Sequence, residues 1–228
     1  MRILSILLAG FLSLVAGSAL AADAVATDVG AANFNWSGAY IGGVAGYGWD
    51  RNTSNYFGSS VDFDANGFVG GATAGYNWQR GQWVFGIEGD ISYADMKGDV
   101  VAPAPSAPCY IEGCSAEINW YGTGRARVGY AFENFLPYAT GGFAVGHVKG
   151  SADLGACGFT PTCSYSDTRW GWSAGAGVEW AFNQHLSFKA EYLHVDLGTP
   201  SITSLNPPFP SVDRINFDTV RVGINYHF

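Results

Sequence analysis

The last sixteen residues, DRINFDTVRVGINYHF, constrain the fold most strongly because they alternate between apolar and polar side chains up to the final position. The apolar positions are Val220, Val222, Ile224, Tyr226 and Phe228, and the residues between them are polar or glycine. Such alternation predicts a β-strand with one apolar and one polar face. An apolar face that ends in aromatic side chains is typical of a strand that crosses a membrane in a β-barrel.

The first 21 residues have the layout of a secretion signal, in which Arg2 precedes an apolar run and small residues stand at Ala19 and Ala21. This layout predicts cleavage after Ala21. An N-terminal membrane anchor is the alternative, but Ser and Gly interrupt the apolar run and no basic cluster follows it. We therefore expect a cleavable signal peptide over 1–21, a flexible lead-in over 22–35 and one barrel domain over 36–228.

Alternating runs recur along the rest of the chain and predict eight strands, at 36–50, 66–78, 82–97, 116–132, 137–150, 168–182, 185–197 and 213–228. Each run is long enough to cross a bilayer at a tilt, which takes about 9–11 residues. Short turns alternate with long loops, which we expect at 51–65, 98–115, 151–167 and 198–212. This sorting predicts an all-β, eight-stranded antiparallel up-and-down transmembrane barrel in the outer membrane of a Gram-negative cell.

The two faces of these strands differ in chemistry. One face is apolar and aromatic, with Trp83, Phe85 and Tyr93 in one run and Ile118 and Trp120 in the next, as expected for contact with lipid. The other face carries four acids and four bases: Glu88, Asp90, Arg125, Arg127, Glu179, Lys189, Glu191 and Arg221. An eight-stranded barrel encloses only enough space for side chains, so we expect these charges to pair within the lumen.

Four cysteines in a secreted chain indicate an oxidising compartment. They form two local pairs in predicted loops, Cys109 with Cys114 and Cys157 with Cys163. Neither spacing is that of a zinc half-site, so two loop disulfides are predicted in preference to a metal site or free thiols. The net charge of -8 argues against nucleic acid as a partner. No cofactor or metal site is predicted.

Three stretches, FNWSGAYIGGVAGYGW, PYATGGFAVG and VRVGINYHF, resemble the small outer-membrane immunogenic or porin-like proteins of alphaproteobacteria, relatives of the OmpA-type eight-stranded barrel. The resemblance implies a surface protein that is anchored in outer-membrane lipid and meets host or environmental molecules through its loops. It also implies a C-terminal assembly signal at Tyr226 and Phe228, read by the barrel-assembly machinery. The two cysteine pairs are not part of that family pattern.

Several functions are compatible with this sequence. The sequence favours a structural and surface-interaction barrel with a plugged, charge-paired lumen. A narrow porin-like channel for small solutes is the alternative, because glycines on the lumen face would leave a path for water. An outer-leaflet lipid-modifying enzyme would need a histidine beside Ser or Asp, for which His194 near Asp196, and His147, are candidates. No serine motif accompanies them, so an enzyme is not expected. A soluble lipocalin-like carrier would need the apolar face turned inward.

Overall fold

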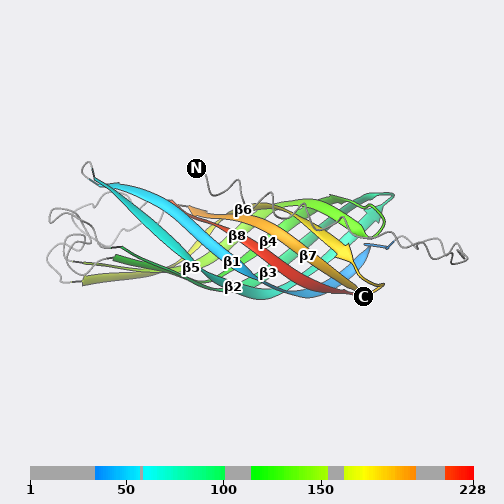
Figure 1. The fold of residues 1–228 in the computed structure, drawn as a ribbon, viewed down its shortest axis with the longest axis horizontal. Helices are drawn as coiled ribbons and strands as arrows, with labels where there is room; N and C mark the ends of the chain where they lie inside the picture. The colour runs from blue at the N-terminus through cyan, green and yellow to red at the C-terminus, as the bar shows by residue number, and fades with distance from the viewer. Residues whose placement is uncertain (1–33, 57–58, 101–113, 154–161, 199–213) are drawn as a thin grey trace, which may run out of the picture. The chain divides into compact units, whose positions relative to one another are not determined.

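The computed structural model describes residues 34–56, 59–100, 114–153, 162–198 and 214–228. These residues form eight strands: β1 (Gly38–Tyr56), β2 (Ser59–Arg80), β3 (Trp83–Val100), β4 (Cys114–Tyr130), β5 (Phe135–Asp153), β6 (Thr162–Ala181), β7 (Leu186–Gly198) and β8 (Ile215–His227). Each strand pairs antiparallel with the next one, and β8 pairs with β1, so the sheet closes into a barrel in chain order (Figure 1). The predicted eight-stranded up-and-down barrel is therefore confirmed. In the described ranges, no helix is both long and apolar enough to cross a bilayer.

The alternation of side chains fixes which face of each strand lines the lumen, because neighbouring residues on a strand point to opposite faces. In β7, Ser187, Lys189 and Glu191 are buried, whereas Phe188 and Tyr192 are exposed. The aromatic face is therefore on the outside and the charged face on the inside, as predicted for a membrane barrel. A lipocalin-like carrier has the opposite arrangement and is excluded.

The outside of the barrel carries two aromatic belts. The inner aromatic belt lies at the short turns and contains Trp78, Trp83, Trp180, Phe182, Phe188 and Tyr226. The outer aromatic belt lies toward the long connections and contains Tyr47, Phe68, Tyr93, Trp170 and Tyr192. Along β3, the path from Trp83 to Tyr93 is about 34 Å, which becomes about 26 Å along the membrane normal at a strand tilt of about 40°. This height matches the apolar band of an outer-membrane barrel, about 25 Å.

Three sequence-based expectations are wrong in the described backbone. Most of the predicted loop 51–65 is strand, because β1 and β2 stay paired as far as Tyr56 and Ser59. Residues 151–153 and 162–167 of the predicted loop 151–167 are strand for the same reason, because β5 and β6 stay paired as far as Asp153 and Thr162. Ile118, expected on the outer face, is only 4 % exposed and lies in the lumen. The cause is a β-bulge: β4 pairs Ile118 with Val148 and Trp120 with His147, so Asn119 is an extra residue that reverses the alternation.

Some predictions fall outside what the structure describes. The predicted disulfides involve Cys109, Cys114, Cys157 and Cys163, and the described part contains only the backbone of Cys114 and Cys163. The predicted signal peptide over 1–21 also lies outside the described ranges. Both stay predictions.

Candidate functional site

The lumen at mid-barrel contains a network of charged side chains. The structure places together all eight charged residues that the sequence assigned to the inner face, and none of them exposes more than 8 % of its surface. They extend from β3, β4, β6, β7 and β8, so they meet only because the sheet closes. We call them the charge network: Glu88, Asp90, Arg125, Arg127, Glu179, Lys189, Glu191 and Arg221.

Arg125 lies at the centre of the charge network. Its Nη2 lies 2.5 Å from Glu88 Oε1 and 2.9 Å from Asp90 Oδ2, and its Nη1 lies 3.0 Å from Glu191 Oε1. Arg221 binds two of the same carboxylates, with Nη1 at 3.0 Å from Asp90 Oδ1 and Nη2 in contact with Glu191. Two guanidinium groups therefore share two carboxylates, an arrangement that offsets the desolvation of all four side chains.

The other charges of the network are paired in the same way. Arg127 Nη2 lies 2.8 Å from Glu179 Oε2, and Lys189 Nζ lies 2.9 Å from Glu88 Oε2. Glu179 also accepts hydrogen bonds from Ser187 at 2.5 Å and Asn225 at 2.7 Å. Every acid of the network thus has a base within hydrogen-bond distance, and the formal charges of the network sum to zero.

Two tyrosines that were not among the predicted site residues complete the network. Tyr40 donates a hydrogen bond to Glu88 at 2.8 Å and accepts one from Arg127 at 3.0 Å. Tyr138 donates to Glu191 at 2.8 Å, and its ring centre lies 4.0 Å from the guanidinium carbon of Arg127. The signal that identifies them is a tyrosine at an inward position of a strand together with a glycine at the paired position of the next strand, Gly75 for Tyr40 and Gly177 for Tyr138.

Glycines provide the space for these rings. Gly75 lies directly opposite Tyr40 in the register of β1 and β2, and a Cβ atom placed on it would lie 2.4 Å from the Tyr40 ring. A Cβ atom on Gly48 would lie 2.6 Å from Met96 Sδ. The space left by these glycines is therefore occupied by side chains of nearby strands. The water path along lumen glycines that the channel alternative assumed is not formed at these positions.

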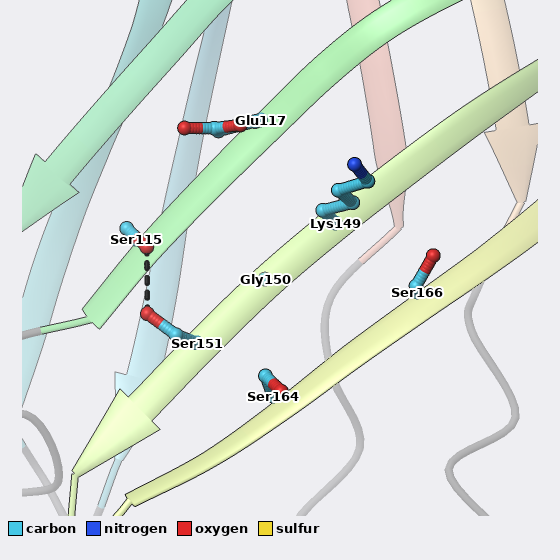
Figure 2. A pocket seen from close by; sticks show the side chains of 7 residues that line it. All are labelled: Ser115, Glu117, Lys149, Gly150, Ser151, Ser164 and Ser166. Carbon is cyan, nitrogen blue, oxygen red and sulfur yellow. Dashed lines mark hydrogen bonds between the residues drawn. The ribbon is translucent and has the colours of Figure 1, made fainter.

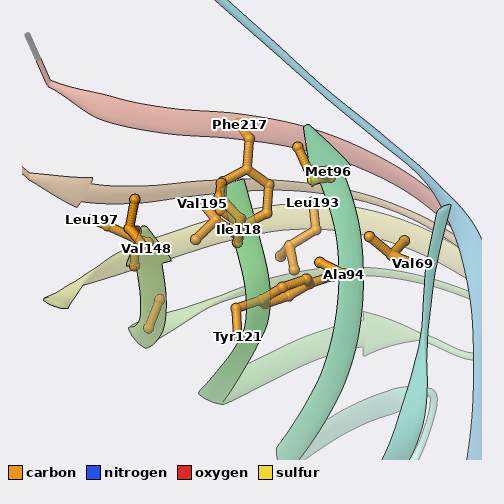
Figure 3. Close-up of a cluster of buried hydrophobic side chains, with 11 residues drawn as sticks. Val69, Ala94, Met96, Ile118, Tyr121, Val148, Leu193, Val195, Leu197 and Phe217 are labelled. Carbon is orange, nitrogen blue, oxygen red and sulfur yellow. The ribbon is translucent and has the colours of Figure 1, made fainter. Parts of the chain in front are cut away.

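An apolar cluster fills the lumen on the outer side of the charge network (Figure 3). We call it the outer apolar cluster: Val69, Ala94, Met96, Ile118, Tyr121, Ala144, Val148, Leu193, Val195, Leu197 and Phe217. The rings of Tyr121 and Phe217 meet edge to face with their centres 5.1 Å apart. The sequence-based interpretation missed this cluster because it expected a polar lumen along the whole barrel.

The signal for the outer apolar cluster is a change of phase in the alternation. In β7 the apolar residues point outward as far as Tyr192, and from Leu193 to Leu197 they point inward. In β2 the same change falls between exposed Phe68 and buried Val69. Beyond the outer aromatic belt the outside of the barrel meets water, so the only place left for apolar side chains is the lumen.

A second apolar cluster closes the other end of the lumen. This inner apolar cluster consists of Phe34, Trp36, Val84, Ala131, Leu136 and Ala181. The ring centres of Phe34 and Trp36 lie 4.6 Å apart, and the backbone N–H of Trp36 donates to Gln79 Oε1 at 2.8 Å. Phe34 precedes the predicted start of the barrel at residue 36, so the segment that leads into β1 also contributes to the packing.

His194, a candidate for an enzyme function, pairs with Asp218 and not with the neighbouring Asp196. Its Nδ1 lies 2.8 Å from Asp218 Oδ1, because His194 and Asp218 are directly opposite in the register of β7 and β8. Tyr192 donates to the same carboxylate oxygen at 2.6 Å, and Asp196 pairs with Arg214 at 2.6 Å. This cluster lies on the outer face and contains no serine.

His147, the other candidate, lies on the outer face between two hydroxyl groups. Its Nε2 is 3.2 Å from Ser166 Oγ and its Nδ1 is 3.2 Å from Thr168 Oγ1. Within the described residues no carboxylate bonds the ring, so the third member of a catalytic triad is missing. The described part of the chain also contains no group of three or more His, Cys, Asp or Glu residues that could hold a metal ion.

Comparison with known proteins agrees with this architecture. The family model described as "Outer membrane protein beta-barrel domain" matches residues 9–228. The 31 kDa outer-membrane immunogenic protein of Brucella melitensis is 37% identical over 243 residues, which cover 98% of this chain and 99% of the relative. The 22 kDa outer membrane protein of Rhizobium leguminosarum is 36% identical over 162 residues, which cover 71% of this chain and 64% of the relative.

Among solved structures, the outer membrane protein OprG from Pseudomonas aeruginosa aligns with a TM-score of 0.50 at 14% identity and covers 86% of this chain and 98% of that chain. At this identity the likeness concerns the fold alone. The match over nearly the whole length and the identity to the Brucella relative establish the family. This chain therefore belongs to the outer-membrane β-barrel proteins of Gram-negative bacteria, in the group that includes the alphaproteobacterial immunogenic proteins.

Proposed function

We propose that this outer-membrane protein is a closed barrel that anchors and displays its external connections, and that it is neither a solute channel nor an enzyme. The observation that carries this proposal is that three layers of side chains follow one another along the lumen: the outer apolar cluster, the charge network and the inner apolar cluster. A solute would have to pass all three. Apolar constrictions by themselves stop ions, because water withdraws from them.

The energetics of the charge network support a closed lumen. To open a path at mid-barrel, a side chain such as Arg125 must leave its three carboxylate partners. Breaking a buried ion pair costs about 3–5 kcal/mol, and even about 3 kcal/mol keeps an opened state below about 1 % of the molecules. A resting barrel of this kind would conduct only rarely.

The external ends of the strands support a role at the surface. β1 and β2 remain paired beyond the outer aromatic belt as far as Tyr56 and Ser59, and β5 and β6 as far as Asp153 and Thr162. Figure 1 shows the β1–β2 hairpin reaching past the neighbouring strands at the end opposite the C-terminus. We infer that these extensions are the parts that meet host or environmental molecules, as the word "immunogenic" in the name of the Brucella relative suggests for that protein.

The route to the membrane follows from the same proposal. A signal peptide over residues 1–21 would direct export, and 22–35 would lead into the barrel. Tyr226 and Phe228 are exposed on the outer face of the last strand, where the barrel-assembly machinery would bind them during assembly.

Conductance across a planar lipid bilayer tests the closed lumen. We expect the refolded wild-type barrel to give no regular conductance steps. A variant with one side chain shortened in each layer, Phe217→Ala, Tyr40→Ala and Leu136→Ala together, should give steps and so demonstrate that the assay detects opening. Phe85→Ala on the outer face is the matched control and should stay silent. Frequent, uniform steps from the wild type would overturn the proposal in favour of a narrow channel.

A further inference from the structure

A shallow polar pocket lies on the outer wall of the barrel, beyond the outer aromatic belt (Figure 2). Its volume is about 300 Å³, and its polar lining consists of Ser115 and Glu117 from β4, Lys149 and Ser151 from β5, and Ser164 and Ser166 from β6. In β5, Lys149 and Ser151 are exposed, whereas Val148 and Gly150 are buried toward the lumen. The pocket therefore faces the surroundings of the barrel and is separate from the charge network.

The height of the pocket above the membrane restricts its ligand. Ser166 precedes Trp170 of the outer aromatic belt by four positions, which corresponds to about 13 Å along the strand and about 10 Å along the membrane normal. The polar region of a phospholipid bilayer is only about 5–8 Å thick on each side. A lipid that fills this pocket therefore needs a headgroup that extends farther from the hydrocarbon, as that of a glycolipid does.

The side chains in the pocket match a phosphorylated sugar. Lys149 lies opposite Glu117 and Ser166 in the strand register, yet within the described residues its ammonium group has no ion-pair partner. Lys97, on the same wall, differs because its Nζ lies 2.8 Å from Asp95 Oδ1. A free ammonium group binds phosphate as a point charge, and serine hydroxyls both donate and accept hydrogen bonds, as sugar hydroxyls do.

Neighbouring side chains already order the polar groups of the pocket. His147, whose Nε2 contacts Ser166 at 3.2 Å, stacks on Trp120 with the ring planes 5° apart and the centres 6.3 Å apart. Within the lining, the hydroxyl oxygens of Ser115 and Ser151 lie 2.7 Å apart (Figure 2). Such contacts hold the polar groups in place before a ligand binds, which lowers the entropy cost of binding.

We propose that this pocket binds the phosphorylated sugar headgroup of a glycolipid of the outer leaflet, with Lys149 on a phosphate and Glu117, Ser164 and Ser166 on sugar hydroxyls. The bound lipid would fix the barrel in the outer leaflet on the β4–β6 side. The proposal is independent of the closed lumen, because none of the lining residues belongs to the three lumen layers.

The test is a binding titration of the refolded mature chain in detergent with three probes: bisphosphorylated lipid A, the same lipid without its phosphates, and phosphatidylglycerol. We expect the wild type to prefer bisphosphorylated lipid A. Lys149→Gln should weaken that binding about tenfold, the loss expected for one hydrogen bond to a charged group, and leave binding of the dephosphorylated lipid nearly unchanged. Lys97→Gln is the matched control and should change neither affinity by more than about twofold.

The sugar contacts have their own variant. Ser164→Ala with Ser166→Ala should weaken both forms of lipid A about equally, because these hydroxyls contact sugar and not phosphate. Equal affinity of the wild type for phosphatidylglycerol and lipid A, or equal losses in the Lys149 and Lys97 variants, would overturn the proposal in favour of unspecific attraction of anions. Heat-modifiable migration of each variant on a gel verifies that the barrel is folded, so a loss of binding cannot come from unfolding.

Discussion

Replacing Arg125 with methionine should destabilise the barrel more than any other single change in the charge network. Arg125 binds three carboxylates, and methionine keeps most of its volume while it removes the charge. Glu88 would retain Lys189, and Asp90 and Glu191 would retain Arg221. Four acids would then face three bases, so the buried network would carry a net charge of about -1.

The magnitude follows from these partners. Removing one member of a buried ion pair costs about 3–5 kcal/mol, because the remaining charge stays desolvated. Each carboxylate near Arg125 keeps one cation, so we expect a loss in the lower part of this range, about 3–4 kcal/mol in the free energy of unfolding. The double variant Arg125→Met with Glu191→Gln restores neutrality and should recover at least about 1.5 kcal/mol of that loss.

Urea unfolding of the barrel in lipid vesicles, followed by tryptophan fluorescence, measures these differences by linear extrapolation. Lys97→Met is the control for loss of a surface lysine and should leave the unfolding midpoint unchanged, since its ammonium group and Asp95 both lie in solvent. A loss below about 1 kcal/mol for Arg125→Met would refute the reasoning that a closed, paired network stabilises the barrel. So would a double variant whose loss equals the sum of the two single losses.

Other positions give independent tests. Gly75→Ala should lower the free energy of unfolding by about 1–3 kcal/mol in the same assay, because the new Cβ meets the hydrogen-bonded ring of Tyr40. Gly43→Ala is the control and should be neutral, since the nearest atom to its new Cβ is 3.9 Å away. Equal effects of the two variants would contradict the close fit between Gly75 and Tyr40. Ile87→Arg at mid-membrane should cost about 2–4 kcal/mol, and an unchanged midpoint would show that this face does not meet lipid. Phe228→Ala should lower the amount of folded protein in outer-membrane fractions severalfold. The stability of the refolded barrel should stay unchanged, since Phe228 is 72% exposed. A loss of stability in this variant would indicate that Phe228 has a packing role instead.

Sequence reasoning predicted the membrane-spanning part of the fold well because the environment there imposes a strict alternation. Between the two aromatic belts an outward side chain meets lipid and an inward one meets the lumen, so Trp83, Glu88 and Arg125 can each be assigned from their position in a run. The charge network could be predicted for the same reason, since only the closed interior of so narrow a barrel can hold charges.

Beyond the outer aromatic belt an outward side chain meets water and need not be apolar, so the alternation predicts the fold less well there. The outer part of the β1–β2 hairpin is predicted as a loop because its alternation is out of phase with the rest of β2. Val61, Phe63 and Ala65, at odd-numbered positions, alternate with acidic residues, whereas the apolar outward residues Phe68 and Tyr76 stand at even-numbered ones. The sequence predicts the wrong face for Ile118 because a bulge at Asn119 cannot be recognised from the pattern of one strand. The partners of His194 depend on the register between β7 and β8, and no local spacing contains that information.

Closure of the charge network constrains how the chain can enter a membrane. Arg221 in the last strand binds Asp90 in β3, 131 positions earlier, so the ion pairs are complete only when the final strand has joined the sheet. A flat or half-curled sheet would expose unpaired carboxylates and cations to the hydrocarbon of the membrane. Each cation near the midplane would raise the free energy by about 2–4 kcal/mol. Insertion of one hairpin at a time is therefore uphill at every step. The sheet must curl with its charged face toward the aqueous interior, and β8 must pair with β1 while the barrel enters the lipid.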